Sequence, residues 1–153
     1  LLLAGTAVDS SPESIRYYQQ VYDYVMDNHL NSYIHFIGWR SDIRDVFEKS
    51  DIYVSTSYSE SFPDAVREAM LASLPVVVTD VGGTRELVDV GKNGYLFRPG
   101  DIQTLTDHVG MLADNHVLRK NMGLEGKRII DSKFSTEAYA RDFEDMLNQL
   151  VTQ

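Results

Sequence analysis

Two glutamates bracket the start of a predicted helix. Residues 57–70 read Ser-Tyr-Ser-Glu-Ser-Phe-Pro-Asp-Ala-Val-Arg-Glu-Ala-Met, with Glu60 before the helix and Glu68 in its second turn. Pro63 suits the first helical position, because proline lacks the N–H that a helix start leaves unpaired. The free amides of such a turn can hold a phosphate, and ionised carboxylates can accept hydrogen bonds from hydroxyl groups. The stretch therefore predicts a site for a phosphorylated, hydroxyl-rich ligand.

A structural role is the simpler explanation for any one of these acids. Carboxylates near a helix start offset the helix dipole, and Asp64 fits that role. Glu68 lies past the first turn, where the dipole gives it little help. A simple cap does not explain both glutamates.

The surrounding pattern alternates strands and helices. Strands are predicted at 1–5, 33–38, 51–56, 75–79 and 95–97, and the first helix begins at the cap Ser11-Pro12. Later helices are predicted at 42–49, from Pro63 to about residue 73, around 86–88, from Asp101 to about 112, at 116–130 and at 136–150. The pattern indicates an α/β fold of Rossmann type, an open parallel sheet with helices on both faces. Ligands of such folds bind at the carboxyl ends of the strands, where both the Glu60 loop and the Gly82-Gly83 loop should lie.

Composition narrows the class of protein. The 153 residues include 43% hydrophobic and 24% charged residues, which suits one globular domain. The formal net charge of −9 argues against nucleic-acid binding, and the lack of cysteine excludes thiol chemistry. We expect a soluble cytoplasmic domain, since neither a membrane span nor a signal peptide is evident. Because the chain opens directly on a buried-strand pattern, we interpret it as a fragment whose first strand and helix are missing.

An ordered set of motifs carries a resemblance to a known family. The E-x7-E spacing follows a strand that ends in Ser-Thr. Val-Val-Val-Thr-Asp-Val-Gly-Gly-Thr-Arg-Glu and Asn-Gly-Tyr-Leu-Phe come after it, Ile-His-Phe-Ile-Gly-Trp precedes it, and Lys-Phe-Ser-Thr-Glu-Ala lies downstream. Together they resemble the C-terminal, donor-binding domain of a retaining glycosyltransferase of GT-B fold, family 4 (glycosyl transferases group 1). The resemblance covers nearly all of residues 1–153.

The resemblance implies roles for particular residues. Glu60 would face the donor sugar and the reacting end, as the catalytic residue, and Glu68 would accept hydrogen bonds from the ribose hydroxyls. The backbone at Ser61, Phe62 and Pro63 would approach the sugar and phosphates, and Gly82 and Gly83 would let the ligand approach bare backbone. The loop of Gly38, Trp39 and Arg40 would cradle the base. Two positions depart from the family pattern: Ser61 stands where glycine is frequent, and Asp64 where asparagine is.

The resemblance also bears on cofactors and partners. The donor would be a nucleotide diphosphate sugar, and a divalent metal is not expected; His29, His35, His108 and His116 are scattered. The acceptor would bind mainly to an N-terminal domain outside these residues, as would the family's diphosphate-clamping Arg and Lys. We therefore expect the 153 residues alone to have negligible transferase activity. The full enzyme could associate peripherally with the inner face of the membrane, and the exposed edge at Leu1–Ala4 predicts self-association.

Two other functions stay open on the sequence alone. One is a GT-B relative with different chemistry, such as a sugar-nucleotide epimerase or a phosphorylase, although the additional acid/base groups and cofactor lysine of such enzymes are not evident. The other is a non-catalytic nucleotide-binding or interaction module, although no G-x-G-x-x-G follows the first strand. Nucleotide binding that depends on Glu68 would separate the transferase from the second alternative.

Overall fold

Each described strand runs parallel to the strand it pairs with, and strands alternate with helices along the chain. The structure is a computed structural model that describes residues 1–6 and 11–151; the loop predicted after Gly5 and through Asp9 lies largely outside these residues. The strands are β1 (Leu2–Ala4), β2 (His35–Gly38), β3 (Tyr53–Ser55), β4 (Val76–Thr79) and β5 (Gly94–Phe97). The helices are α1 (Pro12–Asp27), α2 (Ile43–Glu48), α3 (Asp64–Leu71), α4 (Thr84–Leu87), α5 (Ile102–Asp114), α6 (His116–Lys133) and α7 (Thr136–Val151). The predicted fold class is confirmed.

The described strands form two sheets rather than the continuous sheet that the sequence pattern predicts. β1 pairs with β2, and β3, β4 and β5 pair in that order, all in parallel. The chain correspondingly divides into a first unit, Leu1–Ile43, and a second unit from Arg44 onward.

In the first unit, α1 packs its aromatic residues on β2. Ser11 caps α1 by accepting a hydrogen bond from the Ser14 amide at 3.3 Å, and Pro12 takes the first helical position, as predicted. Tyr18 and Tyr22 contact Phe36 with ring centroids 5.7 and 5.4 Å apart. Among the described strands, β1 pairs only with β2, which leaves the other edge of β1 without a strand partner. Self-association through this edge stays a prediction.

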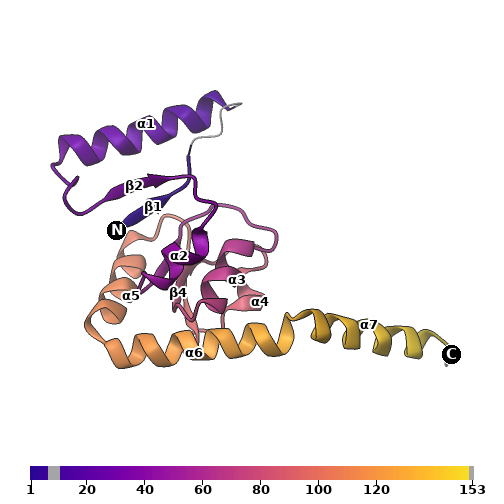
Figure 1. Ribbon diagram of the computed structural model, residues 1–153. Helices are drawn as coiled ribbons and strands as arrows, with labels where there is room; N and C mark the ends of the chain where they lie inside the picture. The colour runs from indigo at the N-terminus through magenta and orange to yellow at the C-terminus, as the bar shows by residue number, and fades with distance from the viewer. Residues whose placement is uncertain (7–10, 152–153) are drawn as a thin grey trace. The chain divides into compact units, whose positions relative to one another are not determined.

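In the second unit, the core surrounds β4. All four residues of Val76–Thr79 are buried, as expected for a strand covered on both faces. In Figure 1, α3 and α5 lie on opposite sides of β4, and α6 runs along the end of the unit. Val66, Ala69 and Met70 form the buried face of α3, and Glu68 lies on its exposed face.

A buried asparagine fixes the connection from α4 to β5. Asn93 is fully buried; its side-chain amide donates to the Leu87 carbonyl at 2.8 Å, and its side-chain oxygen accepts from the Asp89 amide at 2.8 Å. Asn93 therefore anchors this connection in the core.

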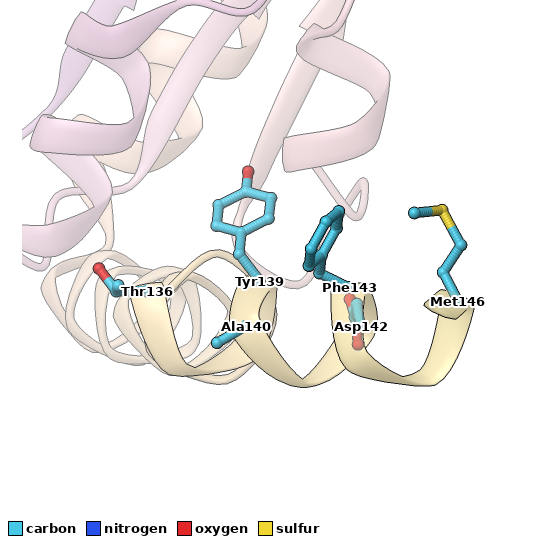
Figure 2. A pocket seen from close by; sticks show the side chains of 6 residues that line it. All are labelled: Thr136, Tyr139, Ala140, Asp142, Phe143 and Met146. Carbon is cyan, nitrogen blue, oxygen red and sulfur yellow. The ribbon is translucent and has the colours of Figure 1, made fainter. Parts of the chain in front are cut away.

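Most of the apolar side chains of helix α7 are exposed. Ala138 is buried, but Tyr139, Phe143, Met146 and Leu150 are all exposed in the structure. Figure 2 shows Tyr139, Phe143 and Met146 projecting from the same side of α7. The helix predicted at 136–150 is present, but of its apolar residues at 138–150 only Ala138, in the first turn, is buried.

Candidate functional site

The loop between β3 and α3 holds Glu60 at the mouth of the helix. Glu60 lies in this loop and Glu68 in the second turn of α3, as predicted. The Glu60 side chain is half-buried and that of Glu68 is exposed. One detail of the prediction is wrong: Pro63 is the N-cap, with φ −75° and ψ 107°, and the helix begins at Asp64. A proline side chain cannot accept a hydrogen bond, so the first-turn amides of α3 have no side-chain cap.

The pKa of Tyr53, in β3, responds to both glutamates. Burial raises the pKa of Tyr53; its hydrogen bond with the Ser55 side chain opposes this, and the charges of Glu60 and of Glu68 each raise the pKa further. Both carboxylates of the predicted pair therefore act on the pKa of the same side chain. Tyr53 was not among the residues predicted from the sequence; the signal that could have identified it is its two-residue spacing to Ser55, which places both side chains on one face of β3.

Hydrogen bonds fasten the Glu60 loop to the end of β4. The Thr79 hydroxyl donates to the Ser57 carbonyl at 2.6 Å, and the Gly83 amide donates to the Ser61 carbonyl at 2.9 Å. The loop after β4 is itself closed by Thr84, whose hydroxyl donates to the Thr79 carbonyl at 2.9 Å. The two loops that the sequence placed at the strand ends therefore meet in the structure.

The Gly82-Gly83 pair allows this close approach. A Cβ on Gly82 would lie 1.6 Å from the Glu60 carbonyl oxygen, and one on Gly83 would lie 2.4 Å from that of Ser61. Gly82 also has a φ of +49°, which residues with a side chain adopt at a cost. The bare backbone thus accommodates the Glu60 loop, and contact of these glycines with a donor stays a prediction.

The side chain of Phe62 is an anchor inside the protein. Its ring lies 5.6 Å from the ring of Phe134 and 5.4 Å from the guanidinium carbon of Arg67, and a Cβ on Gly83 would lie 2.9 Å from it. Pro63 is buried beside it, whereas Ser61 is exposed. Of the predicted donor-contacting residues Ser61, Phe62 and Pro63, Phe62 therefore has its ring committed to packing, and contact of any of the three with a donor stays a prediction.

Ion pairs set the charges of this edge. The Arg67 guanidinium donates to Asp64 at 2.9 Å, so the negative charge that Asp64 adds near the helix start has a partner within the protein. Asp80, directly after β4, forms an ion pair with Arg85. The Nε and Nη2 of Arg85 both donate to its carboxylate, the Nη2 at 2.6 Å. The hydrogen bond from Arg85 lowers the pKa of Asp80.

The remaining predicted site residues belong to the first unit. Gly38 ends β2 with a φ of +67°, and its carbonyl accepts a hydrogen bond from the Gly5 amide at 2.8 Å. Trp39 follows with 73% of its surface exposed. The Arg40 Nε donates to Asp42 at 2.7 Å. Glu60, Ser61, Phe62, Pro63, Glu68, Gly82 and Gly83 all belong to the second unit, and a role for Gly38, Trp39 and Arg40 in base binding stays a prediction.

Three further observations concern metals, membranes and cavities. Among residues 1–6 and 11–151, no group of three or more His, Cys, Asp or Glu side chains has an arrangement that could hold a metal ion. Within the same residues, no helix has the length and apolar character needed to cross a bilayer. A shallow hollow is lined by α7 residues, among them Thr136, Tyr139 and Phe143 (Figure 2), and none of its lining residues belongs to the Glu60 loop.

Comparison with known sequences gives one family. The sequence model described as Glycosyl transferases group 1 matches residues 1–115. N-acetyl-alpha-D-glucosaminyl L-malate synthase of Bacillus anthracis is 28% identical over 120 residues, which are 78% of this chain and 32% of that protein. The chain therefore spans about a third of the length of this curated relative.

Solved structures also resemble this chain. Alr3699/HepE of Anabaena in complex with UDP has a TM-score of 0.86 and 25% identity, covering 97% of this chain and 40% of that one. The C-terminal domain of a glycosyl transferase group 1 family protein, LpcC of Francisella tularensis, has a TM-score of 0.75 and 26% identity, covering 82% and 66% of the two chains.

Proposed function

Because this chain belongs to the glycosyl transferases group 1 family, we propose that it is the donor-binding, C-terminal domain of a retaining GT-B enzyme of family 4. The enzyme would transfer a sugar from a nucleotide diphosphate sugar to an acceptor, with the anomeric configuration kept and without a divalent metal. The chain of HepE that resembles this one was solved with UDP, which supports a nucleotide as the ligand.

The observation that carries the proposal is the position of the two glutamates around an uncapped helix start. Pro63 leaves the first-turn amides of α3 without a side-chain partner, and such amides suit the diphosphate. Glu68 stands on the exposed face of the same helix, where an ionised carboxylate can accept hydrogen bonds from two ribose hydroxyls. Glu60, held at the helix mouth, would face the sugar.

In the reaction, the amides and the Glu60 carboxylate at this edge of the sheet would stabilise the charges that develop during bond cleavage. Bond cleavage at the anomeric carbon leaves negative charge on the diphosphate, and preoriented amides stabilise such charge without reorganising. Phe62 and the Gly82-Gly83 loop hold the backbone at Ser61 and Phe62 in position for that task. The Glu60 carboxylate, next to the reacting end, would stabilise the positive charge that develops on the sugar.

Calorimetric titration tests this division of roles. UDP, GDP and ADP, and then UDP-glucose, GDP-mannose and ADP-glucose, are titrated into the wild-type chain and into Glu68→Ala, Glu60→Ala and the control Glu144→Ala, whose side chain is exposed on α7. We expect Glu68→Ala to weaken nucleotide and nucleotide sugar alike by about 10-fold or more, since hydrogen bonds to a charged group are worth about 1.5–3 kcal/mol. Glu60→Ala should weaken only the nucleotide sugar, and Glu144→Ala neither.

The proposal fails if no nucleotide binds to the wild-type chain. It also fails if the affinity is the same in Glu68→Ala and Glu144→Ala, because the binding would then belong to a non-catalytic module with a different site.

A further inference from the structure

Phe134 stands at the joint between the last two helices. It is the C-cap of α6, and its amide donates to the Ile130 carbonyl at 2.9 Å. The next residue, Ser135, accepts a hydrogen bond from the Ala138 amide at 3.2 Å and so begins α7. Phe134 therefore has a position fixed by two helices, and it lies beyond residues 1–115, where the family model matches.

From this joint Phe134 reaches the Glu60 loop. Its ring contacts the ring of Phe62 at 5.6 Å with an interplanar angle of 49°, and both side chains are half-buried. Phe62 lies two residues after Glu60 and directly before the N-cap of α3. A displacement of its ring would therefore shift the backbone on both sides of it.

Two further neighbours of the Phe62 ring, Arg67 and Gly83, come from the proposed site itself. Arg67 belongs to α3, and Gly83 belongs to the loop that hydrogen-bonds to Ser61. Both adjoin the Glu60 loop directly, α3 through the chain and Gly83 through its hydrogen bond to Ser61. Phe134 belongs to a different element, so its contact ties the loop to the α6–α7 joint.

We propose that Phe134 is a positioning residue of the donor site, acting through the ring of Phe62 on the loop that carries Glu60. This inference rests on the function proposed above. Phe134 does not touch the donor. It fixes the position of the loop amides that would face the diphosphate. The joint between α6 and α7 thereby influences the geometry of the site.

The expected effect follows from the strength of such a contact. Aromatic pairs contribute beyond the area they bury, and removing one corresponds to roughly a 2- to 12-fold change in an equilibrium constant. Phe134→Ala should weaken the binding of the nucleoside diphosphate by a factor in that range. Phe134→Tyr, which keeps the ring, should restore wild-type affinity. Phe143→Ala is the control, because it removes an aromatic residue of α7 that is 58% exposed.

Double-mutant cycles separate positioning from a general loss of stability. Calorimetry with whichever of UDP, GDP and ADP the wild-type chain binds is repeated on Phe134→Ala, Phe62→Leu, Glu68→Ala and the two double variants that contain Phe134→Ala, all below their melting temperatures. The effects of Phe134→Ala and Phe62→Leu should not add, because the second change removes a contact that is already lost. The effects of Phe134→Ala and Glu68→Ala should add. If Phe134→Ala does not fold, Phe134→Leu takes its place in every comparison.

The outcomes distinguish this inference from the proposed function. If the wild-type chain binds no nucleotide, the proposed function fails and this inference with it. If the wild-type chain binds a nucleotide in a Glu68-dependent way but Phe134→Ala binds like Phe143→Ala, or if the effects at Phe134 and Phe62 simply add, the inference alone is overturned.

Discussion

A single methyl group at Gly83 should displace the Glu60 loop. The Cβ of an alanine there would lie 2.4 Å from the Ser61 carbonyl oxygen and 2.9 Å from the Phe62 ring, while the φ of −74° suits any residue. The change is therefore purely steric. Overpacking of this kind costs about 1–3 kcal/mol, and the lost hydrogen bond from Gly83 to Ser61 adds about 1 kcal/mol. We expect the free energy of unfolding to fall by roughly 2–4 kcal/mol in Gly83→Ala.

Three other glycines provide matched controls. Gly82→Ala combines a clash at 1.6 Å with a φ of +49°, so it should destabilise more than Gly83→Ala. Gly100→Ala has a φ of +84° but nothing within 4 Å, and should cost only about 1–2 kcal/mol for the left-handed backbone. Gly110, inside α5, has neither problem, so Gly110→Ala should stabilise by about 0.5–1 kcal/mol.

Urea denaturation of the four variants measures these differences, and calorimetry with the nucleotide shows whether the loop has moved. The Gly82 and Gly83 variants should lose nucleotide affinity, because relieving the clash moves the Glu60–Ser61 backbone. The Gly100 and Gly110 variants should keep it. Our reasoning would be refuted if Gly83→Ala were no less stable than Gly100→Ala and bound nucleotide like the wild type.

Two further predictions concern Tyr53 and Asn93. Burial raises the pKa of Tyr53, and the charges of Glu60 and Glu68 add to the effect, so the folded state holds the phenol proton to a higher pH than the unfolded chain does. The stability that this provides should be complete below the ordinary tyrosine pKa of about 10. It should be lost as the pH rises through the folded-state pKa. Ultraviolet absorbance titration, with Tyr53→Phe as the difference standard, should show a lower Tyr53 pKa in Glu60→Gln and in Glu68→Gln. An unchanged Tyr53 pKa in both variants would contradict the influence of the two charges on this phenol. Asn93→Ala should cost about 2–4 kcal/mol in urea denaturation, because it leaves the buried Leu87 carbonyl without its partner. Asn121→Ala, on the exposed side of α6, should stay within about 0.5 kcal/mol of the wild type, and equal effects of the two would rule out the anchor role.

Local features of the fold could be predicted well. The caps Ser11 and Asp101, the buried strand at residues 76–79 and the buried face of α3 all follow from spacing along a few neighbouring residues. The shift of Pro63 from the first helical position to the N-cap is a difference of one residue, because proline's fixed φ fits both positions. The division of the strands into two sheets was not predictable, since alternation of strands and helices gives no strand order.

The sequence by itself determined that two carboxylates flank a helix start at the carboxyl end of a parallel strand, because periodicity and chain order decide both facts. Only the tertiary structure decided what holds them there: Gly83 against Ser61, Phe134 against Phe62, and one phenol at Tyr53 that both glutamates influence. The physical reason is that these contacts join residues from different elements. Residue spacing indicates which face of an element is apolar, but not which loop that face will meet once the chain has folded.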